Sequence, residues 1–183
     1  MVYPFAKRNL LILCQSGSIC PDLYSHSCPC GYLGDSRHVC TCKQKDIDNY
    51  RRKISGPLMD RIDMQINLAR VDFSELKDKQ AGESSAVIRE RVVRARQIQQ
   101  ERLEPWGIHC NAQMGRQEVV KYCQLGPDAQ QVMEKYFNIL NLSARSHDRI
   151  LKVARTIADL AGCANIQASH IAEAVTLRAN NRS

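Results

Sequence analysis

The chain has 183 residues, of which 44% are hydrophobic, 25% are charged and only 5% are aromatic, and its formal net charge is +7. This length suits one domain, or one compact domain with an appended segment. No stretch approaches the roughly 20 apolar residues of a membrane helix, and the apolar run at residues 10–14 is shorter than the core of a secretion signal. We therefore expect a cytoplasmic protein with no membrane partner.

The N-terminal part of the chain has little regular pattern. Residues 1–27 show no clear hydrophobic period, and residues 28–45 form a loop rich in cysteine, proline and glycine. A polar, basic helix is predicted at residues 45–53. Apolar side chains alternate with polar ones from residue 62 to residue 68, which is typical of a half-buried strand. Apart from residues 10–13, nothing else offers this strand a partner, so residues 46–83 read as the remnant of a sheet-containing core and a linker.

Residues 84–183 change to a helical pattern. Capping residues and helix breakers divide this part into segments with apolar residues on one face, as in a compact bundle. In the first helix, Ile88, Val92, Ala95 and Leu103 are expected to share the buried face. The five predicted helices run from about residue 85 to 103, 111 to 123, 127 to 140, 144 to 161 and 168 to 178.

Several ordered strings carry a family resemblance. Residues 28–32 read CPCGY, residues 56–63 read GPLMDRID, residues 142–160 read LSARSHDRILKVARTIADL and residues 170–174 read HIAEA. Together they resemble the magnesium-chelatase-like AAA+ ATPases of the ComM type over roughly residues 28–178. Long, ordered matches of this kind are more specific than a single short motif.

The resemblance implies a fold and partners. In that family an α/β AAA+ core binds ATP and Mg²⁺ between ring subunits, and a helical lid follows. We therefore expect a mainly α protein: a five-helix lid at residues 84–183, preceded by a core remnant and a cysteine-rich loop. The implied partners are an AAA+ core of the same family or neighbouring ring subunits. DNA is a further expected partner, because family members are implicated in ATP-driven branch migration.

The resemblance also assigns roles to arginines. Arg61 corresponds to an arginine finger, whose planar and permanently charged group stabilises charge on a γ-phosphate. Arg145 corresponds to the sensor-2 position that contacts bound nucleotide, and Arg149 and Lys152 follow on the same helical face. The alternatives are a surface ion pair of Arg61 with Asp60 or Asp63, and a solvated helix start at Arg145.

The chain departs from the family pattern in its nucleotide-binding residues. It contains no Gly-x-x-x-x-Gly-Lys-Ser/Thr phosphate loop and no apolar strand that ends in paired acids. Ser25, His26 and Ser27 stand where the family has a strand leading to a sensor-1 asparagine. We expect that the chain alone does not hydrolyse ATP. A truncated or frameshifted reading frame would explain these departures.

Cys28, Cys30, Cys40 and Cys42 form two Cys-x-Cys pairs. Four thiolates satisfy a structural, closed Zn²⁺ site, although this spacing is narrower than the usual Cys-x₂₋₄-Cys. The alternative is four free thiols in a loop. The sequence thus leaves three hypotheses: a motor-subunit fragment, a zinc-stabilised nucleic-acid-binding or protein-interaction module, and an inactive remnant.

Overall fold

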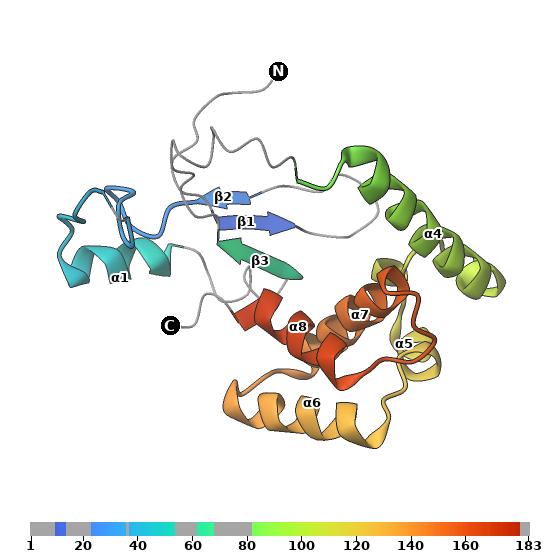
Figure 1. Ribbon diagram of the computed structural model, residues 1–183. Helices are drawn as coiled ribbons and strands as arrows, with labels where there is room; N and C mark the ends of the chain where they lie inside the picture. The colour runs from blue at the N-terminus through green and yellow to red at the C-terminus, as the bar shows by residue number, and fades with distance from the viewer. Residues whose placement is uncertain (1–9, 14–22, 36, 54–61, 68–81, 180–183) are drawn as a thin grey trace. The chain divides into compact units, whose positions relative to one another are not determined.

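The computed structural model describes residues 10–13, 23–35, 37–53, 62–67 and 82–179 (Figure 1). They belong to two compact units. The first unit comprises residues 1–14 and 20–79, and the second comprises residues 15–19 and 80–183. Each unit is described by itself.

The first unit contains a three-stranded antiparallel sheet in the order β2-β1-β3. Strand β1 (Leu10–Leu13) lies in the middle, between β2 (Leu23–Ser25) and β3 (Met64–Asn67). In the register, Leu11 lies opposite Tyr24 on one side and Ile66 on the other. The strands predicted near residues 10–13 and 62–68 are confirmed. Strand β2 was not predicted, because three residues are too few to show an alternating pattern.

Helix α1 (Gln44–Arg52) confirms the polar helix predicted at residues 45–53. Ile47 is its one buried residue, and no side chain caps its N-terminus. Basic residues in its last turn complement the negative end of the helix dipole. Little apolar packing therefore supports α1 within the described part of the first unit.

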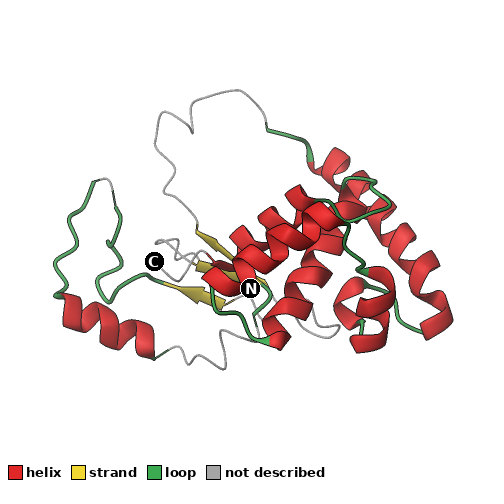
Figure 2. Cartoon of the chain, turned by 90° about the horizontal axis from the view of Figure 1, so that it is seen from below, coloured by secondary structure: helices red, strands yellow, loops and turns green. Residues whose placement is uncertain are grey.

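The described residues of the second unit form a bundle of five α-helices, which confirms the expected mainly helical fold. Figure 2 shows helices in red. Helix α7 is central, since it packs against α4, α5 and α8, and α6 packs against α8. Two 3₁₀ turns connect α4 to α5. The elements are α4 (Ser85–Leu103), η1 (Glu104–Trp106), η2 (Asn111–Gln113), α5 (Arg116–Tyr122), α6 (Pro127–Ile139), α7 (Ala144–Leu160) and α8 (Ala168–Ala179).

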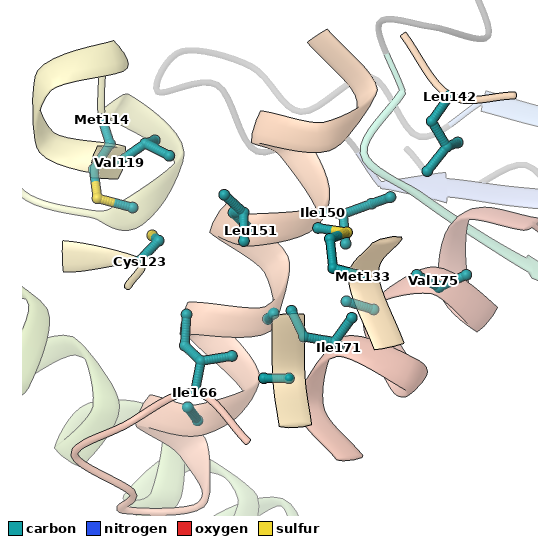
Figure 3. Close-up of a cluster of buried hydrophobic side chains, with 14 of the residues drawn as sticks. Met114, Val119, Cys123, Met133, Leu142, Ile150, Leu151, Ile166, Ile171 and Val175 are labelled. Atoms are coloured by element: carbon teal, nitrogen blue, oxygen red, sulfur yellow. The ribbon is translucent and has the colours of Figure 1, made fainter. Parts of the chain in front are cut away.

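The apolar core of the bundle lies where α5, α6, α7 and α8 meet (Figure 3). Ile150 of α7 and Ile171 of α8 are fully buried, and Met133 of α6 packs into the same cluster. Their spacing follows the predicted faces of these helices, on which Ala154, Ala174 and Val175 are also buried. The helical period predicts a buried face at Ile171, Ala174 and Val175 of α8, which is correct. On the face that it predicts for α7, Val153 and Ile157 are only half-buried and Ala161 is exposed.

The single helix predicted from residue 111 to residue 123 is wrong. The segment is split into η2 and α5, because Met114 has an extended backbone with ψ of 132°. Asn111 begins the 3₁₀ turn, and α5 has a separate start at Gly115, whose backbone N–H donates to Glu118 Oε2 at 2.6 Å. Apolar spacing alone did not reveal this break.

The predicted buried face of α4 is correct only in the C-terminal half of the helix. Ala95 and Leu103 are buried, but Ile88 and Val92 keep 41% and 43% of their surface exposed. The first half of α4 thus presents apolar side chains that are not buried in the described structure.

None of the described helices combines the length and the apolar character that a bilayer-crossing segment needs.

Candidate functional site

The four cysteines of the loop lie between β2 and α1 in the chain. A turn closes where the backbone N–H of Gly31 donates to the carbonyl of Cys28 at 3.1 Å, and a second closes between Asp35 and Tyr32. Gly31 and Gly34 both have a φ of +79°, a conformation that residues with a Cβ rarely adopt. These two glycines therefore allow the chain to fold back and bring the Cys28–Cys30 pair close to the Cys40–Cys42 pair.

The loop brings the four sulfurs into one cluster. The Sγ of Cys28 lies 3.4 Å from that of Cys30 and 3.7 Å from that of Cys40. The Sγ atoms of Cys30 and Cys40 are 3.6 Å apart, and all four sulfurs, including that of Cys42, lie within 4.8 Å of one another. Every one of these cysteines is a free thiol. The structure thus brings together all four predicted metal ligands.

The electrostatics of the cluster differ from one thiol to the next. The pKa of Cys30 falls to about 6, because the backbone N–H of Tyr32 and the thiols of Cys28 and Cys42 donate hydrogen bonds to its sulfur. At Cys42 the backbone N–H of Cys30 also favours the thiolate, but burial and the neighbouring thiols outweigh it and raise the pKa to about 12. A cation among the sulfurs would favour ionisation of all four. The cluster has the chemistry to hold a metal ion.

Arg145 occupies the first turn of α7. Ser143 caps this helix by accepting a hydrogen bond from the Ser146 backbone N–H at 3.2 Å. The Arg145 side chain is exposed and has no hydrogen-bond or ion-pair partner among the described residues. A cation at the positive end of a helix dipole is locally unfavourable. Arg145 therefore does not stabilise its own helix, and its exposed guanidinium is accessible to an external anion.

The other basic residues predicted on α7 differ in their surroundings. Arg149 is half-buried one turn beyond Arg145. The ammonium of Lys152 donates to the carbonyl of Ala112 at 3.3 Å, so Lys152 holds η2 against α7. Arg61 lies outside the described residues. Arg145, Arg149 and Lys152 were predicted to share one face of α7. Of these three residues, only Arg145 is exposed.

Arg178, at the end of α8, was not predicted from the sequence to lie near Arg145. Its Nη2 donates to the Oγ of Ser146 at 3.0 Å, which places a second guanidinium at the same end of α7 as Arg145. A basic residue in the last turn of a helix is common, because it complements the helix dipole. No sequence signal therefore distinguishes Arg178, whose proximity to Ser146 depends on the packing of α8 against α7.

Asp159 was also missed. Its buried carboxylate accepts two hydrogen bonds from Arg102 of α4, one from Asn111 at the start of η2 and one from Arg155 of its own helix. Arg155 also donates to the carbonyls of Cys163 and Ala164. Asp159 thus joins α4, η2 and the end of α7, and fixes the helix that carries Arg145.

Comparison with known proteins assigns the family. A family model described as "Magnesium chelatase, subunit ChlI C-terminal" matches residues 82–178, and one described as "Magnesium chelatase, subunit ChlI" matches residues 24–76. These matches contain Arg145 and the four clustered cysteines, respectively. The resemblance derived from the sequence strings is therefore confirmed.

Curated relatives agree with this assignment. Competence protein ComM of Haemophilus influenzae is 39% identical over 74% of this chain, and protein YifB of Salmonella typhimurium is 35% identical over 84%. Protein Mb2921c of Mycobacterium bovis is 30% identical over 85%. The aligned part of the chain covers between 26% and 30% of the length of these relatives. The chain belongs to the magnesium chelatase ChlI C-terminal family.

Proposed function

We propose that this chain provides the nucleotide-sensing lid of a magnesium-chelatase-like AAA+ ATPase, whose phosphate loop and magnesium ligands are in another polypeptide segment. The observation that carries the proposal is Arg145, an exposed guanidinium without a described partner at the positive end of α7. Helix N-termini and arginine side chains both attract phosphate groups. The match of residues 82–178 to the family gives this arrangement its functional context.

Each proposed arginine has a separate part in this function. Arg145 acts at sensor 2, and Arg149 supports it one turn further along α7. Arg61 acts as an arginine finger toward a neighbouring subunit, where a fixed positive charge stabilises the transferred phosphoryl group. ATP and Mg²⁺ are thus bound by the assembled motor and not by this chain alone. As the family resemblance of the sequence strings implies, the assembly acts on DNA by branch migration.

The test uses the chain together with a core polypeptide of a relative that contains a phosphate loop. Removal of an arginine that stabilises phosphate charge in the transition state lowers kcat by about 10³-fold or more. We therefore expect Arg145→Ala to abolish most of the ATPase activity of the mixture. The matched control is Arg89→Ala, which changes an exposed arginine on a different helix, α4. This variant should leave the activity unchanged. Equal activities of the two variants would exclude the sensor role.

A second candidate function is a zinc-stabilised nucleic-acid-binding or protein-interaction module. It is favoured by the basic side chains that follow the cysteine cluster, where Lys45, Arg51, Arg52 and Lys53 are all exposed. Phosphate contacts release counterions, so DNA affinity in this case should fall steeply with salt. An affinity that stays constant between low and moderate salt would argue against it.

The free cysteines also favour the reducing cytoplasm as the location.

A further inference from the structure

We infer that Cys28, Cys30, Cys40 and Cys42 bind a single Zn²⁺ and that this ion, rather than an apolar core, holds residues 28–53 in their folded conformation. The inference deepens the zinc proposal above by assigning a role to the ion. It is independent of the nucleotide role of Arg145, which lies in the other unit. Three observations support the inference: the separations of the four sulfurs, the hydrogen bonding of the loop to the Cys28 sulfur, and the small amount of apolar burial in α1.

The sulfur spacing fits one tetrahedral ion. Four thiolates at about 2.3 Å from Zn²⁺ place their sulfurs roughly 3.8 Å apart. The observed separations are 3.4 Å for Cys28 and Cys30, 3.6 Å for Cys30 and Cys40, and 3.7 Å for Cys40 and Cys28. A cluster of several iron atoms would hold its ligands further apart. The geometry therefore matches a mononuclear centre.

The chemistry of the ligands selects the metal. Thiolates are soft ligands that bind Zn²⁺ and bind Mg²⁺ or Ca²⁺ poorly, and a four-thiolate site leaves zinc no open position for substrate. Cys28 is fully buried, whereas the other three sulfurs belong to half-buried residues, so an ion can reach the site from solvent. A closed, structural zinc centre follows from this ligand set.

The loop provides the hydrogen bonding that a buried thiolate needs. The backbone N–H of Leu33 donates to the Sγ of Cys28 at 3.3 Å. This bond compensates negative charge on the most buried of the four sulfurs, and groups that hydrogen-bond to metal ligands in this way fix their orientation. It forms because the turns at Gly31 and Gly34 fold the chain back over Cys28. The loop conformation is thus organised around the sulfur of Cys28.

The apolar packing of this segment is insufficient to hold it. Of residues 28–53, excluding residue 36, only Cys28 and Ile47 are buried. Helix α1 has nine residues and lacks a side-chain cap, and helices this short are marginal without tertiary support. Cys28 lies three residues after the end of β2, and Cys42 lies two residues before the start of α1. Figure 1 shows the loop that joins these two elements. An ion bound to both therefore closes the loop and fixes the start of α1.

The experiment measures metal content and local stability in the full chain. The purified protein should contain about one zinc per chain by elemental analysis. Removal of the zinc with a chelator should raise amide hydrogen exchange of residues 44–52 by about tenfold or more, because local opening then becomes easy. Exchange in α6, α7 and α8 should stay the same. Zinc addition should restore the protection of α1.

Variants separate the site from the other thiols. Cys28→Ser together with Cys42→Ser should lose the zinc and the protection of α1. Cys110→Ser together with Cys163→Ser, which changes two half-buried cysteines outside the cluster, should keep both. Co²⁺ added to the metal-free chain should give the intense visible absorption of a tetrahedral tetrathiolate centre. If the double serine variant is insoluble, the chelator experiment on the unchanged chain still decides the question.

Two results would overturn the inference. One is a chain that is purified without zinc and takes up neither Zn²⁺ nor Co²⁺. The other is bound zinc whose removal leaves the exchange of residues 44–52 unchanged, which would show that the ion does not hold this segment. Neither readout involves nucleotide, so failure here leaves the role of Arg145 untouched, and loss of that role leaves the zinc site untouched.

Discussion

Arg102 and Asp159 form a paired ionic contact that joins α4 to α7. The Nη1 of Arg102 lies 2.9 Å from Oδ1 of Asp159, and its Nη2 lies 2.6 Å from Oδ2. The same carboxylate binds Arg155, so one negative charge balances two guanidinium groups. The Asp159 side chain is 0% exposed and that of Arg155 only 4%. The stability of the bundle should therefore depend strongly on this carboxylate.

Asp159→Asn should lower the free energy of unfolding of the bundle by about 3–5 kcal/mol, because it leaves buried guanidinium charge without compensation. Urea denaturation followed by circular dichroism measures this change. Asp148→Asn is the control, since Asp148 pairs with Arg116, whose side chain is 68% exposed. An exposed pair contributes about 1 kcal/mol or less. Similar losses of unfolding free energy in the two variants would show that the buried Asp159 network stabilises the bundle no more than the exposed Asp148 pair does.

Ile171→Ala should destabilise the bundle by about 2–5 kcal/mol, because it leaves a cavity between α7 and α8. Ile171 is 0% exposed in the core cluster, whereas Val120 on α5 is 59% exposed. Val120→Ala should therefore change the midpoint of urea unfolding very little. A small effect of Ile171→Ala would mean that α8 does not pack on α7 as described.

Ser143→Ala should lower stability by roughly 1 kcal/mol, because the first turn of α7 loses its side-chain cap. Ser84→Ala removes the corresponding cap of α4, where the bond to the Val87 N–H is longer, at 3.4 Å, and the surrounding residues are exposed. We expect a loss of about 0.5 kcal/mol there, at the lower end of the range for a lost N-cap. Thermal unfolding of the two variants compares the caps, and a larger loss at Ser84 would contradict the structure.

Cys123 should react slowly with thiol reagents. Cys123 directly follows α5 and its side chain is buried in the apolar core. This burial raises the pKa of its thiol to about 12. The thiolate is the reactive form, so almost none is present at pH 8. Mass spectrometry after brief alkylation should show Cys163, which is half-buried, labelled well before Cys123. In urea the two should label at similar rates, and equal labelling in the folded chain would contradict the burial of Cys123.

Local signals in the sequence were sufficient for most helix boundaries. Pro127 begins α6, Ser143 caps α7 and Gly162 follows the end of α7, and these residues are among the capping residues and helix breakers from which the helix ranges were predicted. These residues act through the backbone of their own turn, so their effect does not depend on distant contacts. The proximity of the four cysteines was also predictable, because they are close in sequence and separated by turn-forming residues.

Contacts between distant segments were not predictable in this way. Arg102 and Asp159 are 57 residues apart, and nothing near either residue indicates the partner. Ile88, Val92, Ala95 and Leu103 were all expected on the buried face of α4, but only Ala95 and Leu103, in its second half, are buried. The period of a helix shows which side chains share a face and not whether another element covers it.

The measurement closest to the central claim is equilibrium binding of MgATP to the purified chain, with and without a relative's core that has a phosphate loop. The account predicts no measurable binding to the chain alone. It also predicts that adding the chain strengthens nucleotide binding by the core, and that Arg145→Ala removes this gain. Stoichiometric binding of MgATP by the isolated chain, retained when both Arg61 and Arg145 are changed to alanine, would contradict it.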